Sequence, residues 1–212
     1  MRIFSIELSS RFGSIALVED RRVVVEQRWE ENFKNRQQLF DAVEAMAIDW
    51  DSVGAFAVGR GPGAFSGMRI AFSVVNTLAQ VGAKPVYALN SGAVLAKRFG
   101  AEQTVVVGDA RRKQVWAGLF RGAQLEREFE LLELDQLTDY VPSGALVVSP
   151  DYDRLEELLA GFHKPDPPES VFPTAGELGI LIAKRVAAGE ASEPLEPLYM
   201  HPPVFIEPRF ST

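Results

Sequence analysis

Apolar residues fall along the chain in two kinds of pattern, short dense runs and longer segments in which they recur every three or four positions. Short runs between polar turns are typical of buried strands, and the wider spacing is typical of amphipathic helices. In the first half, the predicted strands cover residues 3–7, 14–18, 23–29, 55–58 and 85–89, and the predicted helices cover residues 35–48, 67–81 and 91–99. In the second half we predict a strand over residues 145–148 and helices over 151–160 and 175–188. This mixture predicts an α/β protein.

The helix predicted over residues 67–81 has two apolar faces and no charged residue after Arg69. One face is formed by Met68, Phe72, Val75 and Ala79, and the other by Ile70, Val74, Leu78 and Val81. A helix that is apolar all round is buried on both sides. One face can pack on the sheet of its own domain. The other face must be covered by further residues. A second layer of this chain and a partner protein are equally plausible.

Between the strand at 55–58 and this helix lies a loop of unusual composition, Gly59–Gly67, with four glycines and one proline in nine residues. Glycine supplies backbone angles that other residues avoid, and proline has a fixed φ and no N–H donor. We therefore predict a tight turn between strand and helix, with Ser66 or Gly67 as the N-cap of the helix. The residues of this structural loop are Gly59, Gly61, Pro62, Gly63, Phe65, Ser66, Gly67 and Arg69.

Two phosphate-binding interpretations of the loop are weaker than a structural one. A P-loop requires a lysine after its last glycine, and none follows Gly67. The spacing of Gly59, Gly61 and Ala64 loosely matches a dinucleotide fingerprint, but Pro62 removes an N–H where a pyrophosphate would bind. No acidic residue occurs in the 80–90 region, where a ribose partner is expected. We therefore expect a stiff turn that sets the direction of the following helix.

The order of strands in the first part of the chain recurs 102 positions later, where Asp109 takes the place of Glu7. The run 14–18 then matches 116–120, and the run 23–28 matches 125–130. Such a repeat is the signature of a duplicated domain. We predict two subdomains, residues 1–100 and a smaller one at 101–212 that ends in a proline-rich tail, with residues 194–208 extended over the surface.

Composition narrows the choice of function. The 212 residues carry a net charge of −7, which argues against a protein that holds nucleic acid by itself, and we interpret the basic run Arg111–Lys113 as a solvated turn. There is no cysteine, so disulfides and thiol catalysis are excluded. No apolar run reaches the roughly 20 residues of a membrane span, and Glu7 interrupts the start of the chain in a way unlike a signal peptide. We expect a cytoplasmic protein.

Glu7 and Asp109 end equivalent strands, so their carboxylates could meet in a cleft between the halves. Such a pair could hold Mg²⁺ or act in acid–base chemistry, but hydrogen bonds from turn N–H groups are the favoured explanation. No Gly-x-Ser-x-Gly occurs, and His163 and His201 both lie within two residues of a proline, without the spacing of a zinc site. The residues therefore form no complete catalytic set and no metal site.

Three segments carry a resemblance to a known family: the loop and helix at Gly59–Ile70, the segment Gly108–Arg112, and the tail around Pro197–Tyr199. Together with the opening strand, they resemble the TsaB (YeaZ) family of tRNA threonylcarbamoyladenosine biosynthesis. The resemblance implies a duplicated fold of the actin/sugar-kinase/heat-shock ATPase type, which is ribonuclease H-like. The resemblance further implies mixed sheets with flanking helices and a reduced second half.

The resemblance also implies a function. Such a protein is not an enzyme but a scaffold that pairs with a TsaD-like paralogue, which carries the metal and the threonylcarbamoyl transfer to adenosine in tRNA. A TsaE-like ATPase joins the pair, tRNA is bound only through the complex, and the chain has no cofactor of its own. When alone it is expected to form a homodimer. The helix residues expected to bind the partner are Leu39, Val43, Met46, Met68, Phe72 and Val75.

The chain departs from the usual family pattern at five positions: Glu7 in place of Asp, Asn35 in place of His, Ala64 in place of Ser, Ala71 in place of Gly, and His201 in place of Arg. Given these departures, we expect Glu7 and Asp109 to form no more than a vestigial nucleotide cleft. The alternative function, from a different class, is a small-molecule kinase or ATPase of the same superfamily that uses these two acids.

Overall fold

The first half of the chain folds around β1 (Arg2–Glu7), an almost wholly buried strand at the centre of a five-stranded sheet. The computed structural model describes residues 1–31 and 37–202. β2 (Phe12–Glu19) and β3 (Arg22–Glu30) follow β1 as antiparallel neighbours, and β4 (Ala55–Gly59) and β5 (Val86–Leu89) run parallel to β1. The sheet order is therefore β3-β2-β1-β4-β5.

The second half repeats this arrangement with one strand fewer. β6 (Thr104–Arg111), β7 (Gln114–Arg121) and β8 (Gln124–Glu133) form an antiparallel meander, and the short β9 (Leu146–Val148) pairs with β6 in parallel. The order β8-β7-β6-β9 matches β3-β2-β1-β4. The predicted α/β fold with two mixed sheets, flanking helices and a reduced second half is confirmed.

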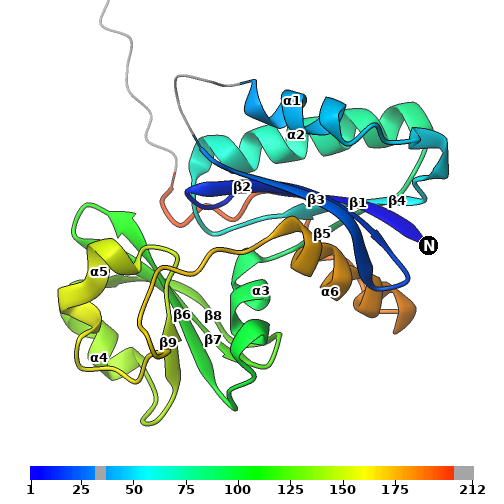
Figure 1. Cartoon of the computed structure of the whole chain (residues 1–212). Coiled ribbons are helices and arrows are strands. Elements are labelled where there is room, and N and C mark those ends of the chain that lie inside the picture. Colours follow the sequence, from blue (N-terminus) through cyan, green and yellow to red (C-terminus); the bar gives the residue numbers. More distant parts are fainter. Residues whose placement is uncertain (32–36, 203–212) are drawn as a thin grey trace, which may run out of the picture.

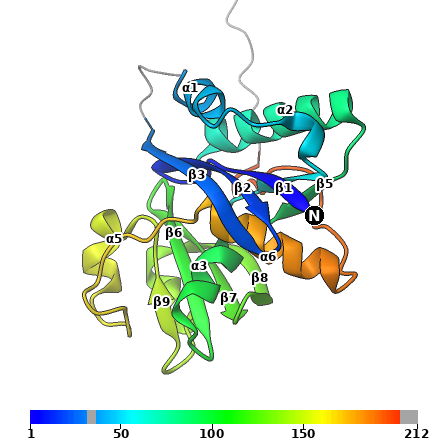
Figure 2. The ribbon, with the colours of Figure 1, turned by 45° about the vertical axis from the view of Figure 1, so that its right-hand side comes forward.

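Helices form three layers around the two sheets, as Figures 1 and 2 show. The helices are α1 (Gln38–Ala45), α2 (Phe65–Gly82), α3 (Ser91–Phe99), α4 (Leu137–Tyr140), α5 (Tyr152–Leu159) and α6 (Ala175–Ala187), with single 3₁₀ turns at Trp50–Ser52 and Leu134–Gln136. α1 and α2 cover the outer face of the first sheet, and α4 and α5 cover the outer face of the second. α3 and α6 lie between the sheets.

The two middle helices are exchanged between the halves. α3 belongs to the first half but packs on β6 and β7, whereas α6 belongs to the second half but packs on the first sheet. The Ser5 hydroxyl, buried in β1, donates to Ala175 O at the start of α6 (2.7 Å) and so fixes this helix on the sheet. The division into residues 1–100 and 101–212 stays a proposal, because each half supplies part of the core of the other.

Two helix starts differ from the prediction. α2 begins at Phe65 with Ala64 as its N-cap, not Ser66 or Gly67, and no side chain caps it, because the Ala64 N–H donates to Ser9 O (2.7 Å) and places the backbone instead. α1 begins at Gln38, and the predicted start at Asn35 lies outside the described residues.

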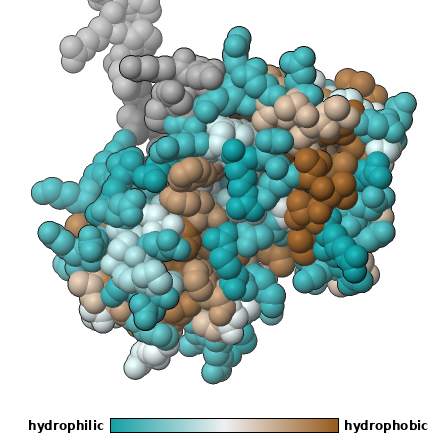
Figure 3. All heavy atoms as spheres, in the orientation of Figure 1, coloured by the Kyte–Doolittle hydropathy of each residue, from teal (hydrophilic) through white to brown (hydrophobic). Residues whose placement is uncertain are grey.

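One exposed apolar patch lies over the edge strand β3 on the face shown in Figure 3, where Val23 and Val24 are exposed.

Among residues 1–31 and 37–202, no helix combines the length and apolar character needed to cross a membrane.

Candidate functional site

The glycine-rich loop closes tightly on the end of β1. A Cβ on Gly59 would lie 1.9 Å from Glu7 Oε2, and a Cβ on Gly67 would lie 2.0 Å from Leu8 O. No real side chain tolerates such distances, so these two glycines are required by the close approach of the loop and of the first turn of α2 to β1. Phe65, Ser66, Gly67 and Arg69, predicted as loop residues, lie in the first turns of α2.

Three backbone N–H groups of the loop donate hydrogen bonds inside the protein. Arg60 N donates to Leu89 O (3.0 Å), and Gly61 N donates to Ser91 Oγ (3.1 Å). Pro62 is buried and has no N–H, and Ala64 N donates to Ser9 O (2.7 Å), two residues beyond the end of β1. These three internal hydrogen bonds favour a structural turn, as the composition of the loop predicted.

Glu7 is fully buried at the carboxyl end of β1, and both of its carboxylate oxygens accept hydrogen bonds. Oε1 accepts from Ser9 N (2.8 Å), and Oε2 accepts from Ser91 Oγ (2.7 Å). Burial raises the pKa of this carboxyl above its ordinary value of 4.5, although the hydrogen bonds from Ser9 and Ser91 act in the opposite direction. The Glu7 side chain therefore joins β1, the glycine loop and the start of α3.

Asp109, at the equivalent end of β6, is surrounded by different groups. Its Oδ1 accepts from Arg111 N (2.7 Å), and its Oδ2 lies 3.0 Å from the Arg111 guanidinium and 3.7 Å from that of Arg154. Its own N–H donates to Asp151 Oδ2 (3.0 Å), and burial raises the pKa of Asp151 from 3.8. Asp151 and Arg154, at the start of α5, were not singled out in the sequence because only the tertiary fold brings α5 to β6.

No hydrogen bond or ion pair joins the side chains of Glu7 and Asp109 in the part of the chain that the structure describes. Within that same part, no group of three or more histidine and acidic side chains is placed to hold a metal ion. The two acids thus serve separate local networks, each with a backbone N–H from the following turn.

The outward face of α2 is not the one that the sequence analysis selected. Met68, Phe72 and Val75 are buried against the first sheet, and Leu39 of α1 is buried in the same cluster. A side chain buried within its own chain cannot contact a partner, so the expectation that these residues bind one is corrected for all four. The remaining two residues of that set, Val43 and Met46, are half-buried at the edge of the cluster.

The second stripe of α2 carries the exposed apolar surface. Ile70 is 42% exposed and Val81 86%, and the half-buried Val74 and Leu78 lie between them. Phe65, the first residue of the helix, is 55% exposed but does not lie on this stripe. Phe40 of α1 adds a further exposed ring on the same side of the sheet. The Arg69 guanidinium lies over the Phe65 ring, 5.3 Å from its centroid. This surface is hereafter called the outer face of α2.

The C-terminal segment 190–201, hereafter the strap, is pinned to the glycine loop rather than loosely extended over the surface. Glu193 is its anchor. The Glu193 carboxylate accepts hydrogen bonds from Asn90 N (2.9 Å) and Asn90 Nδ2 (2.8 Å), and it lies 3.5 Å from the Arg60 guanidinium and 3.7 Å from that of Arg185. Arg60 lies in the loop itself, so the strap holds the loop directly.

Beyond Glu193, the strap crosses the start of α2 and reaches the second half. Leu198 N donates to Arg60 O (2.8 Å), and the Tyr199 ring packs on Phe65 with centroids 4.8 Å apart. His201 Nε2 then donates to Ala110 O in β6 (2.7 Å). The predicted tail is therefore a structural element as far as residue 202, and its remaining predicted residues, 203–208, lie outside the described ones.

We expect Glu193→Ala to lower the free energy of unfolding by about 2 kcal/mol, because hydrogen bonds to a charged group contribute about 1.5–3 kcal/mol and this carboxylate is partly screened by solvent. Amide hydrogen exchange should speed up at Arg60 and Ala88. The control is Glu190→Ala, since Glu190 pairs with Arg185 at an exposed position and should cost under about 0.5 kcal/mol. Equal losses in the two variants would contradict an anchoring role for Glu193.

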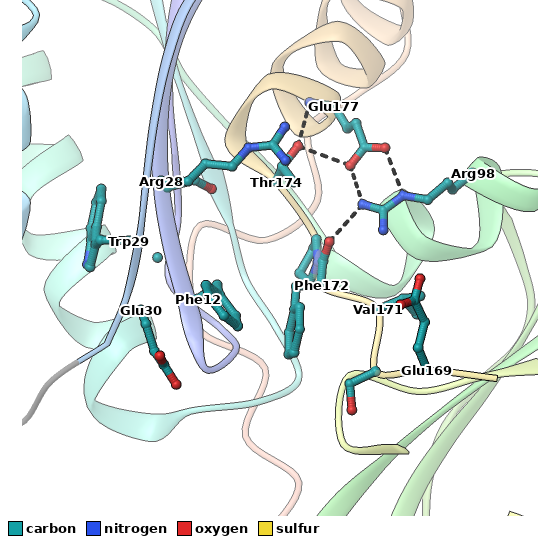
Figure 4. A pocket seen from close by; sticks show the side chains of 14 residues that line it. Phe12, Arg28, Trp29, Glu30, Arg98, Glu169, Val171, Phe172, Thr174 and Glu177 are labelled. Carbon is teal, nitrogen blue, oxygen red and sulfur yellow. Dashed lines mark hydrogen bonds and ion pairs between the residues drawn. The ribbon is translucent and has the colours of Figure 1, made fainter. Parts of the chain in front are cut away.

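A cavity of about 670 Å³ lies elsewhere, between the β2–β3 hairpin, the end of α3 and the segment 169–177. Figure 4 shows Arg98 and Glu177 directed toward each other and Phe12 beside Phe172. Arg98 also donates to Phe172 O (2.7 Å), and Arg28 is held by Glu26. None of the residues predicted for function lines this cavity, and both of its arginines already have carboxylate partners within the chain.

Comparison with known proteins places these features in a family context. The family described as "TsaD: tRNA N6-adenosine threonylcarbamoyltransferase" matches residues 36–130. A Bacillus subtilis protein named tRNA threonylcarbamoyladenosine biosynthesis protein TsaB is 28% identical over 127 residues, which are 57% of this chain and 56% of the relative. The match thus spans little more than half of that relative.

Two solved structures from Pseudomonas aeruginosa match almost the whole chain. One is described as an uncharacterized protein with similarity to peptidase YEAZ; it has a TM-score of 0.79 at 25% identity and covers 94% of this chain and 99% of its own. The other, YeaZ, has a TM-score of 0.76 at 25% identity over 93% and 100% of the two chains.

Proposed function

Because the chain belongs to the TsaB/YeaZ family, we propose that it is a non-catalytic subunit that pairs with a TsaD-like paralogue in the formation of threonylcarbamoyladenosine in tRNA. The paralogue would carry the metal and the transfer reaction. A TsaE-like ATPase as a third component, a homodimer of the free chain and a place in the cytoplasm belong to the same proposal.

The observation that carries the proposal is the outer face of α2. It bears the exposed apolar side chains of Ile70 and Val81, with the half-buried Val74 and Leu78 between them, among polar residues such as Ser73 and Thr77. Interfaces centre on a few apolar anchors of this kind, surrounded by residues that contribute little. The glycine loop and the strap hold the start of α2 in place, so the surface is rigid before a partner binds, which lowers the entropic cost of association.

The alternative, a kinase or ATPase that uses Glu7 and Asp109, has less support. The oxygens of Glu7 are occupied by Ser9 and Ser91, and the N–H groups of Arg60, Gly61 and Ala64 in the loop are bonded within the chain. Magnesium–ATP binding by the isolated chain decides between the two functions. Micromolar affinity that is lost in Asp109→Ala would favour the kinase, and the scaffold proposal expects no such binding.

We expect Ile70→Asp and Val81→Asp to weaken binding of the TsaD-like paralogue from the same organism by about 30-fold or more, the equivalent of about 2 kcal/mol for a central anchor. An aspartate on a dry contact loses its water without gaining a partner. Both residues are exposed in the free chain, so the variants should fold normally. Titration calorimetry or co-purification with the paralogue measures the effect.

The matched control is Val24→Asp, which makes the same change at a 56% exposed valine of β3 on a different surface. It should leave pairing intact. Undiminished pairing of Ile70→Asp and Val81→Asp, or an equal loss in Val24→Asp, would remove the outer face of α2 as the interface. By contrast, Phe72→Asp should fail to fold, since Phe72 is buried.

A further inference from the structure

The turn that joins β6 to β7 carries three consecutive basic residues in an unfavourable backbone conformation. Arg111, Arg112 and Lys113 have φ angles of 66°, 54° and 61°, in the left-handed region that residues with a Cβ avoid. Arg111 pairs with Gln114, so Arg112 and Lys113 form the two-residue connection. Turns of this kind favour Asn-Gly. The chain therefore keeps three cations at a place where another composition would be more stable.

The positive charges at the base of this turn are neutralised by acidic residues, but those at its tip are not. Asp109 and Asp151 engage Arg111 and Arg154. Arg112 and Lys113 are exposed, and neither has an acidic partner among residues 1–31 and 37–202. Since Arg111 is also exposed, we name Arg111, Arg112 and Lys113 the basic tip.

The basic tip lies where several parts of the molecule meet. Ala110, just before it, accepts the hydrogen bond from His201 at the end of the strap, which begins at the glycine loop. On the other side, Arg11 after β1 pairs with Asp153, the neighbour of Arg154 (3.5 Å). The carboxyl end of β6 is therefore tied to the start of α2, where the proposed partner surface begins (Figure 1).

We propose that the basic tip contacts the phosphodiester backbone of the tRNA substrate when the chain is paired with its partner. The inference rests on the proposed function and adds a tRNA-contacting residue set to it. Guanidinium and ammonium groups bind phosphate without reading the base, so the contact positions the tRNA and does not select its sequence. With a net charge of −7, most of the chain repels RNA. Exposed cations without an acidic partner among the described residues occur at the β2–β3 turn (Arg21 and Arg22) as well as at the basic tip, but the tip is the one that the strap ties to the start of α2.

The test compares an unmodified tRNA transcript bound to the assembled pair, with the chain either wild type or R112Q/K113Q. We expect tRNA affinity to fall about 5- to 10-fold and the slope of log K against log salt to become shallower by about 1–2, the loss of one or two phosphate contacts. The control is R21Q/R22Q, which makes the same charge change at the β2–β3 turn. In that turn, the backbone of Arg21 also has a left-handed conformation, and both arginines are exposed. Affinity for tRNA should change less than about 2-fold in this control.

A second variant, R112N/K113G, separates RNA binding from folding. It installs the favoured turn sequence, so its melting temperature should rise while tRNA affinity falls as in R112Q/K113Q. Unchanged tRNA affinity in both tip variants, or an equal fall in R21Q/R22Q, would overturn the inference. Loss of pairing with retained tRNA affinity would instead assign the tip to an acidic protein surface.

Failure of the proposed function gives a different result, because the wild-type chain would then not pair with the paralogue at all. In that case the same variants are compared as isolated chains with the transcript at low salt. A fall confined to the tip variants would support the contact, and the absence of any difference from R21Q/R22Q would reject it.

Discussion

Gly67→Ala should lower the free energy of unfolding by about 3 kcal/mol, the upper part of the range for overpacking a close contact. The added methyl group would lie 2.0 Å from the carbonyl oxygen of Leu8, which is backbone and cannot rotate away. To admit it, the first turn of α2 must move off the end of β1. Equilibrium unfolding in urea measures the loss, and an unchanged slope would show that the denatured states are comparable.

The control is Gly161→Ala, because a Cβ at Gly161 meets nothing within 4 Å. There the substitution should be neutral or stabilise by up to about 1 kcal/mol through the unfolded chain. If Gly67→Ala were as harmless as Gly161→Ala, the close approach of α2 to β1 would not be what requires glycine at the start of this helix.

Glu7→Gln should make the protein more stable than wild type at neutral and alkaline pH and flatten its stability profile. The pKa of Glu7 is raised by burial, so the folded state holds its proton more tightly than the unfolded state does. The contribution of this proton is fully present below about pH 4.5, the ordinary pKa, and is lost as pH rises through the folded pKa. The wild type should therefore lose stability over that interval.

Glutamine fits the same space and suits the same partners. Its carbonyl oxygen can accept from Ser9 N, and its amide can donate to Ser91 Oγ, which has a second lone pair for Gly61 N. The Ser91 hydroxyl then loses Glu7 as its acceptor, which reduces the gain from removing a buried charge. Melting temperatures measured from about pH 4 to about pH 9 test this expectation, because burial shifts the pKa of a carboxyl within roughly this range. Glu156→Gln, at an exposed position of α5, controls for the change in net charge. Parallel profiles of wild type and Glu7→Gln would show that Glu7 does not couple proton binding to folding.

Local pattern predicted most elements because each depends on neighbours in sequence. The short apolar run in β1 and the strand order repeated 102 positions later led to two related sheets. Boundaries were less accurate. The α2 start was placed two residues late because Ala64 lacks a capping side chain, and the hydrogen bond from its N–H to Ser9 O is long-range.

For the proposed partner surface, the sequence identified the helix but not the residues that face outward. The two apolar stripes of α2 were evident in the sequence, but it did not settle which of them faces outward, and the residues named for partner binding lie on the buried one. Glu193 and the strap went unrecognised since an acid among prolines carries no local signal for its partners Asn90 and Arg60. Asn90 itself did carry one, as an N-cap residue before α3.

By itself, the sequence determined the α/β class, the repeat, the tight glycine turn and a helix too apolar to be exposed on all sides, because periodicity and glycine content act over a few residues. Only the tertiary structure decided which stripe of α2 is outward, that α3 and α6 cross between the sheets, and that the strap joins the loop to β6. Those outcomes depend on contacts between residues far apart in the chain, whose free energies no local pattern contains.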